Sequence, residues 1–335
     1  MSSLRRRRPV SLRIGAVALA AIAASADPGA RACGGVAAID DAGREVRLPQ
    51  PAQRIVSLSP GITELLFSAG AGARIVGTTE HSDYPPAARR IPRIARNAGI
   101  DLERVAALRA DLIVAWGSGY SPARLDALRA LGIPVYIAEP RTLAGIATEV
   151  ERLGILTGSP AVATAAAIRF RSRLQSLRNR YAGRKPLRVF VQIWADPLMT
   201  LTGRHVVSEM LQVCGARNVF ERLPGIAPAV NPEAVLAADP DAILTAEPGD
   251  RSGADDGALD FWKRFPGLRA AAHDGFLFLD ADELDRESLR TLDATQALCA
   301  RLARIREAPP APRMPRAGGT TGWIRFGRPD GVGDR

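Results

Sequence analysis

Residues 101–116 read DLERVAALRADLIVAW, and residues 231–246 read NPEAVLAADPDAILTA. At a constant offset Glu103 matches Glu233 and Asp111 matches Asp241. Each stretch begins with a helix-capping Asp or Asn, continues for about two helical turns, and ends in a short apolar run typical of a buried strand. The repeat predicts two lobes of one design, each with a glutamate in the first turn of a helix.

A second pair of stretches agrees with the first. Residues 64–71 (ELLFSAGA) resemble residues 209–216 (EMLQVCGA), and each reads as a helix ended by Gly. The two pairs occur in the same order along the chain, which supports a duplication. On their own, Glu103 and Glu233 are best interpreted as charges that compensate a helix macrodipole, each contributing about 0.3–1 kcal/mol.

Between these stretches, short β-branched segments alternate with helical segments of about ten residues. Such alternation predicts a parallel α/β sheet in each lobe. From Pro160 to Tyr181 there is no Gly or Pro after the first residue, which predicts one helix of roughly 30 Å between the lobes. We expect an N-terminal lobe at 33–157, the connecting helix at 158–183, a C-terminal lobe at 184–306, and a ligand cleft between the lobes.

The ends of the chain have a different composition. Residues 1–32 hold a cationic start, a short apolar core at 14–26 and the Ala30-Arg31-Ala32 sequence, which together predict a secretory signal peptide; residues 24–26 are a second candidate cleavage site. Cys33 raises the question of a lipid anchor, but Arg31 fits a lipobox poorly, and we favour a released protein. No later stretch is apolar enough for a membrane span. Residues 307–335, rich in Pro, Gly and Arg, predict a disordered tail.

The net charge of +10 is concentrated at these two ends. Residues 1–32 carry six Arg and one Asp, and residues 307–335 carry five Arg and three acidic residues. The charge left on the body is too small to indicate nucleic-acid binding.

Chemically reactive motifs are scarce. The three histidines have no metal-ligand spacing, and the three cysteines form no CxxC, so we expect no metal site. The G-x-S-x-G and P-loop motifs are also missing, and we expect no enzymatic activity and no cofactor. In an oxidising compartment Cys214 and Cys299 could form a disulfide; the alternative is two buried free thiols.

Aromatic residues make up 5% of the chain, so their positions are informative. Tyr84 lies in a loop after a predicted strand, and Trp116 and Trp194 end predicted strands, so all three lie where a parallel sheet presents its loops to a crevice. Together they predict a cleft with flat apolar faces, although each alone is more often a packing residue. Asp282 and Arg286 precede the last helix, which we expect at 287–306, and their simplest interpretation is capping with an i, i+4 surface ion pair.

Six segments resemble the periplasmic cobalamin-binding proteins of ABC importers, a class that also includes haem and siderophore binders. They are RIVSLSPGITELLFSAG, SDYPP, GIDLERVAALRADLIVAW, LGIPVY, MLQVCGARNVF and NPEAVLAADPDAIL, and the resemblance covers about residues 52–304. It implies a monomeric periplasmic receptor that captures cobalamin or a related corrinoid and delivers it to a dimeric permease with its ATPase.

The resemblance also assigns roles to single residues. Glu103 and Glu233 match the lobe-surface glutamates that dock onto permease arginines, and a two-fold symmetric partner suits two equivalent carboxylates. The matched ligand contacts are Tyr84, Trp116 and the segment from Asp282 to Arg286, and Trp194 is a further candidate. Cys214 and Cys299 match the family disulfide.

Two positions depart from the cobalamin-binding pattern. Arg96-Asn97 and Ala227 stand where that pattern has tryptophan. Haem or a ferric siderophore therefore remains an alternative ligand, with Tyr84, Tyr120 and His81 as candidate axial ligands for haem. A two-lobed metal chelatase is the alternative from another class, but it would need a His and carboxylate pair in the cleft.

Overall fold

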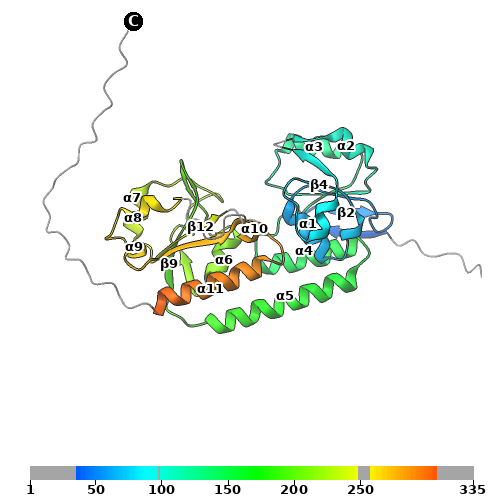
Figure 1. Cartoon of the computed structure of the whole chain (residues 1–335). Helices are drawn as coiled ribbons and strands as arrows, with labels where there is room; N and C mark the ends of the chain where they lie inside the picture. Colours follow the sequence, from blue (N-terminus) through cyan, green and yellow to red (C-terminus); the bar gives the residue numbers. More distant parts are fainter. Residues whose placement is uncertain (1–34, 97–98, 248–256, 285, 308–335) are drawn as a thin grey trace, which may run out of the picture. The chain divides into compact units, whose positions relative to one another are not determined.

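The structure is a computed structural model that describes residues 35–96, 99–247, 257–284 and 286–307 (Figure 1). The expected signal peptide, Cys33, Asn97 and the tail after Glu307 lie outside these residues. The described residues from Gly35 onward form one compact unit. The lobe boundaries at 157/158 and 183/184 therefore stay predictions, and "first lobe" and "second lobe" are used here for the elements before and after the long helix α5.

The first lobe contains a hairpin and a six-stranded sheet in the order β6-β5-β4-β3-β7-β8. All neighbouring strands are parallel except β5 and β6. The strands are β1 (Val36–Ile39), β2 (Glu45–Leu48), β3 (Ile55–Ser57), β4 (Ile75–Thr79), β5 (Arg93–Arg96), β6 (Gly99–Ile100), β7 (Leu112–Ala115) and β8 (Val135–Ile137). The helices are α1 (Pro60–Ser68), η1 (Gly72–Arg74), η2 (Pro86–Arg90), α2 (Leu102–Ala107), α3 (Pro122–Arg129) and α4 (Leu143–Leu156).

The second lobe contains a five-stranded sheet in the order β10-β9-β12-β13, with β11 also paired to β9. Only β10 runs antiparallel to its neighbour. The strands are β9 (Leu187–Ala195), β10 (Leu198–Thr200), β11 (Ala216–Asn218), β12 (Ala242–Glu247) and β13 (Phe276–Asp280). The helices are α6 (Val206–Val213), α7 (Pro232–Ala238), α8 (Asp260–Lys263), α9 (Arg269–Ala272), α10 (Ala281–Leu284) and α11 (Thr291–Glu307).

Alternation along the strands assigns each sheet two buried faces. In β9, Val189 and Val191 point into a core shared with α6 and α11, whereas Phe190 points into a separate cluster with α7, α8 and α9. The first sheet is arranged in the same way: α1 and α4 cover the shared core, and α2 and α3 cover the other face. Helix α2, which carries Glu103, and helix α7, which carries Glu233, therefore lie on equivalent faces of their own lobes.

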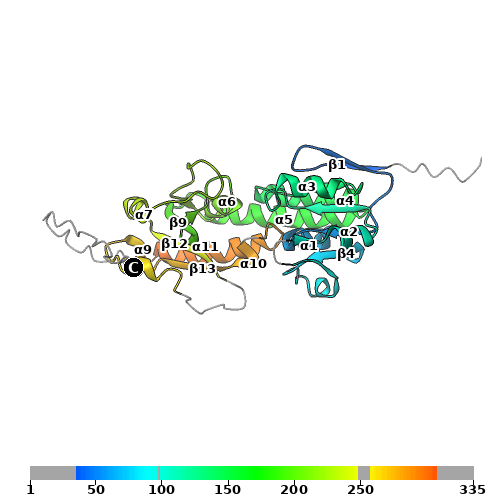
Figure 2. The same cartoon turned by 90° about the horizontal axis from the view of Figure 1, so that it is seen from above.

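Helix α5 (Pro160–Tyr181) has the bounds that the sequence predicted. It packs beside α4 of the first lobe and beside α6 and α11 of the second (Figures 1 and 2). Its buried side adds Phe170, Leu174 and Leu177 to the shared core. Among the helices in the described part of the chain, none has the length and apolar character that crossing a bilayer would require.

Two expected boundaries differ from the structure. The last helix begins at Thr291 and not at Glu287, because backbone amides of the preceding turn are paired with side chains. Ser288 N donates to Thr291 Oγ1, and Arg290 N donates to Ser288 Oγ. The same helix extends through Glu307, which the sequence had placed in the tail. Asp282 lies inside the short helix α10, which was not predicted.

A buried carboxylate lies where α4 meets the hairpin of the first lobe. Glu149 accepts a hydrogen bond from the Tyr136 hydroxyl at 3.1 Å, while its Oε1 has no hydrogen-bond partner within the described residues. Burial and the nearby charge of Asp41 raise the pKa of Glu149 to about 8, although Tyr136 and Arg152 act in the opposite direction. The folded protein therefore holds a proton here that the unfolded chain releases near pH 4.5.

We expect the contribution of Glu149 to the free energy of unfolding to fall as pH rises from about 5 to 8, because the folded state binds the additional proton at this side chain in this window. The slope from Glu149 alone is at most about 1.4 kcal/mol per pH unit. Glu149→Gln, which keeps the shape without a titrating group, should flatten this slope and be more stable than wild type at pH 8. Urea unfolding at pH 5, 6.5 and 8 measures both, and an unchanged slope in the variant contradicts the expectation.

Candidate ligand-binding site

The candidate site lies between the lobes, at the carboxyl ends of their parallel strands. Open parallel sheets bind ligands at this end, since the loops that leave the strands converge there. Ser59 follows β3, Trp116 follows β7 directly, and the segment that contains Arg286 follows β13 and α10. Residues far apart in the sequence are thus brought to one place by strand order.

The first pocket has a volume of about 230 Å³ and is mainly apolar. The first turn of α1 forms one wall, since Ser59 caps this helix by accepting from Ile62 N at 3.1 Å. The ring of Trp116 is 39% exposed and lines the same pocket. From the second lobe, Arg286 and Glu287 complete the wall. A pocket built in this way can hold a flat apolar surface against Trp116 with charged groups at one side.

A second pocket of about 180 Å³ shares Trp116, Pro140 and Glu287 with the first. Its other walls are more polar and include Arg141 and His205. Ala227 also lines it, so the position where the cobalamin-binding pattern has tryptophan does face the cleft.

His205 is a hydrogen-bonding residue in this second pocket. Its Nδ1 accepts from Val207 N at 3.3 Å and so caps α6, and its Nε2 lies 3.6 Å from Glu287 Oε1. Burial lowers the pKa of His205 to about 4, so the ring is neutral at pH 7 with its proton on Nε2. In that tautomer the ring can donate a hydrogen bond but offers no free lone pair to a metal.

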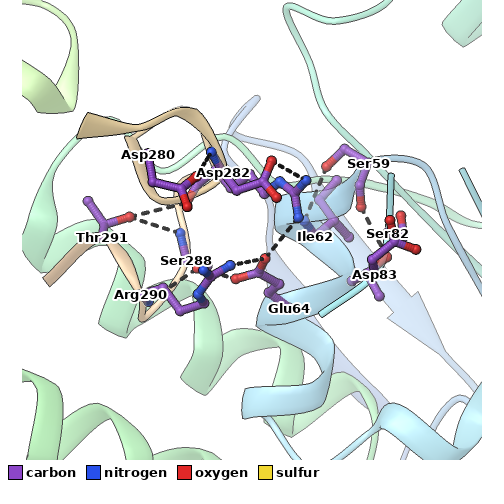
Figure 3. A network of polar contacts seen from close by, with 12 residues as sticks. Ser59, Ile62, Glu64, Ser82, Asp83, Asp280, Asp282, Ser288, Arg290 and Thr291 are labelled. Carbon is purple, nitrogen blue, oxygen red and sulfur yellow. Dashed lines mark hydrogen bonds and ion pairs between the residues drawn. The ribbon is translucent and has the colours of Figure 1, made fainter. Parts of the chain in front are cut away.

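A polar network connects the two lobes beside the first pocket (Figure 3). Glu64 of α1 is 3% exposed and accepts a hydrogen bond from Ser288 Oγ at 2.6 Å. Its Oε1 lies 3.4 Å from Arg286 Nη1 and 3.3 Å from Arg290 Nη1. Burial raises the pKa of Glu64, whereas the hydrogen bond from Ser288 and the charges of both arginines oppose this rise. The sequence had not selected Glu64, whose only signal was its place in the shorter repeat.

Three of the predicted ligand contacts belong to this network. Arg286 Nη2 forms an ion pair with Asp282 Oδ1, and the Arg286 side chain is only 11% exposed. The Asp282 side chain is 47% exposed, so the predicted i, i+4 pair joins a buried guanidinium to a half-exposed carboxylate. Tyr84 is 46% exposed, and the Arg290 guanidinium lies 4.3 Å from the centre of its ring. Tyr84 thus stands at the margin of the network and lines neither pocket.

Trp194 is not brought together with these residues. It is the last residue but one of β9, is 62% exposed, and its Nε1 donates to Asp196 O at 2.8 Å. Neither of the two pockets includes it. Besides Tyr84, the candidate axial ligands for haem are Tyr120, which donates its hydroxyl to Leu58 O at 2.7 Å, and His81, which is exposed. The described residues contain no cluster of three or more side chains suited to a metal ion.

The predicted docking glutamates have equivalent surroundings. Glu103 lies in the first turn of α2 and Glu233 in the first turn of α7, and both are exposed. The cap before each helix has the same geometry: Asp101 accepts from Arg104 N at 3.0 Å, and Asn231 accepts from Ala234 N at 2.8 Å. Their docking role stays a prediction.

Two α/β lobes joined by one long helix, with a pocket between them, define a bilobed binding protein. The chain belongs to the periplasmic binding protein family, whose profile matches residues 55–282. It is 38% identical over 255 residues to the vitamin B12-binding protein of Vibrio cholerae, with 76% of this chain and 90% of that protein covered. It is 37% identical to the vitamin B12-binding protein of Yersinia pestis, with 76% and 88% covered.

Solved structures give the same fold. The periplasmic vitamin B12-binding protein BtuF of Vibrio cholerae matches with a TM-score of 0.69, at 38% identity, over 77% of this chain and 99% of that one. A periplasmic haem-binding protein from Pseudomonas aeruginosa matches with a TM-score of 0.65, at 26% identity, over 78% and 95%. The predicted fold class and family are thereby confirmed.

Proposed function

We propose that this protein is a periplasmic receptor that captures cobalamin or a related corrinoid between its lobes and delivers it to an ABC permease and its ATPase. The observation that carries the proposal is 38% identity over 90% of a vitamin B12-binding protein. The receptor catalyses no covalent reaction and acts as a monomer. Its energetic task is to remove a large, partly apolar ligand from water in a preformed cleft.

The geometry of the cleft supports a corrinoid more than haem. Corrinoids carry their own central metal ligands and many amide groups, and so need a flat apolar wall and hydrogen-bond donors. Trp116 offers the wall, and His205 and Arg286 offer donors. Haem binding would call for an axial ligand. Among the candidates, Tyr120 already donates its hydroxyl to Leu58 O, and Tyr84 and His81 line neither pocket.

Equilibrium titration tests the proposal. The purified mature protein is titrated with cyanocobalamin at micromolar concentrations and monitored by calorimetry, with haemin and a ferric siderophore in parallel. Saturable binding of cyanocobalamin alone is the expected result. Binding of haemin alone would show that the receptor carries haem. If none of the three titrations produces heat, the proposed ligand class is wrong.

Trp116→Ala should weaken cyanocobalamin binding by about tenfold or more, because an aromatic contact with a flat ligand contributes about 0.5–1.5 kcal/mol beyond its buried area. Phe261→Ala is the matched control, since Phe261 is 40% exposed and lies in α8 outside both pockets. Titration of both variants gives the comparison. Equal affinities in the two variants would remove Trp116 from the site.

A further inference from the structure

Two other glutamates occupy equivalent places in the duplicated sequence. Glu64 begins ELLFSAGA and Glu209 begins EMLQVCGA, so the repeat aligns them with each other. Glu64 lies in α1 of the first lobe and Glu209 in α6 of the second. Both helices face the shared core. Unlike the exposed Glu103 and Glu233, Glu64 is buried and Glu209 is only 23% exposed, and both have several polar partners.

The partners of Glu64 all come from the second lobe. Ser288, Arg286 and Arg290 are separated from Glu64 by 224, 222 and 226 residues. They belong to the turn before α11, and Arg286 also lines the first pocket. One buried carboxylate of the first lobe therefore fixes a cleft-lining segment of the second lobe (Figure 3).

Glu209 makes the reciprocal contact. Its Oε2 accepts from Leu143 N, the first amide of α4 in the first lobe, at 2.7 Å. Its Oε1 accepts from Arg178 Nη2 of α5, also at 2.7 Å. The first amides of a helix have no partner inside it, so a carboxylate there satisfies an otherwise unpaired donor and interacts with the macrodipole. The residues just before α4, Pro140 and Arg141, line the cleft.

We propose that Glu64 and Glu209 are a reciprocal pair of positioning residues, each fixing the segment of the opposite lobe that lines the cleft. Each segment is a loop followed by a helix, and ordering such a loop at the moment of binding costs conformational entropy. The two carboxylates order both segments before a ligand arrives. Loss of either should loosen the opposite lobe's segment and leave the other segment in place.

Hydrogen exchange of the ligand-free protein tests this directly. In Glu209→Ala the Leu143 amide should exchange about tenfold faster, because it loses a charge-assisted hydrogen bond. In Glu64→Ala the amides of residues 286–292 should exchange faster, and the exchange rate of the Leu143 amide should not change. Glu209→Gln keeps an acceptor oxygen and should restore most of the protection of Leu143. If Glu64→Ala does not fold, Glu64→Gln, which keeps an acceptor for Ser288, gives the same comparison with a smaller effect.

Glu151→Gln is the matched control, because Glu151 forms a bidentate ion pair with Arg171 between α4 and α5 and touches no cleft segment. It should leave exchange at Leu143 and at 286–292 unchanged. Two outcomes overturn the proposal. One is an equal rise in exchange in the control, and the other is a rise that is spread over the whole variant instead of concentrated in the opposite lobe's segment.

The effect on binding rests on the proposed function. Glu64→Ala and Glu209→Ala should each increase the dissociation rate of cyanocobalamin by about tenfold, since lost preorganisation is expressed mainly in dissociation. Stopped-flow displacement measures this rate. Wild-type protein that does not bind cyanocobalamin would contradict the proposed function and leave the exchange experiment as the test of the two glutamates. If wild type binds cyanocobalamin and both variants release it at the wild-type rate, the positioning role is contradicted.

Discussion

Replacing Glu103 and Glu233 together by arginine is expected to abolish stimulation of transporter ATPase while leaving cyanocobalamin affinity near that of wild type. The two carboxylates lie in the first turns of α2 and α7, on the faces of their sheets that are turned away from the shared core. Neither residue lines a pocket between the lobes. Reversing both charges should therefore disturb only a partner that contacts these helices.

The expected loss follows from charge complementarity. The proposed dimeric permease would present matching basic positions to these two carboxylates, and like charges placed opposite each other at an interface cost several kcal/mol. ATP hydrolysis in proteoliposomes that contain the cognate transporter, with and without the receptor, provides the measurement. Single substitutions should give intermediate stimulation.

The control must carry the same change in charge at a different surface. Glu45→Arg with Glu307→Arg meets this need, since both residues are exposed and lie outside α2 and α7. This variant should stimulate as wild type does. If the Glu103 and Glu233 variant also stimulates fully, these residues act only on their own helices, with the contribution of about 0.3–1 kcal/mol expected for a helix macrodipole.

Features with local causes could be predicted from the sequence. Helix α5 begins at Pro160 and ends at Tyr181 as expected, because no Gly or Pro interrupts it and Gly183 follows it at a positive φ of 70°. The caps at Asp101 and Asn231 were also predictable, because each needs only the capping side chain and the backbone amide three residues later. The two-lobed arrangement was accessible because the duplication repeats these local signals.

Features with distant causes were not accessible in the same way. Glu64 reads locally as one polar residue in an amphipathic helix, and only the fold brings Ser288 and the two arginines to it from more than 220 residues away. The start of α11 was misplaced since residues 287–290 suit a helix by composition but use their side chains to close a turn. Trp194 has the right residue type at the end of a strand, yet the β9–β10 hairpin holds it at an exposed position outside both pockets.

Removing the disulfide should have the largest effect on stability. The structure contains the bond between Cys214 and Cys299, as the family resemblance implied, and both residues are fully buried. It joins the end of α6 to α11 across a separation of 85 residues. A cross-link of this loop length raises the free energy of the unfolded chain by about 4.5 kcal/mol in the chain-entropy relation. Cys214→Ala with Cys299→Ala should lower the free energy of unfolding by about that amount.

Two observations separate this entropic effect from a loss of packing. The unfolded chain without the cross-link is less compact, so the denaturant slope m should increase as stability falls. Urea unfolding of wild type with reductant should match that of the double variant, and reductant should have no effect on the variant itself. The pocket residues do not include either cysteine, so the folded variant should bind cyanocobalamin with near wild-type affinity. A fall in stability below about 1 kcal/mol with unchanged m would show that the unfolded chain is already held compact by other contacts, and that the bond adds little to the fold.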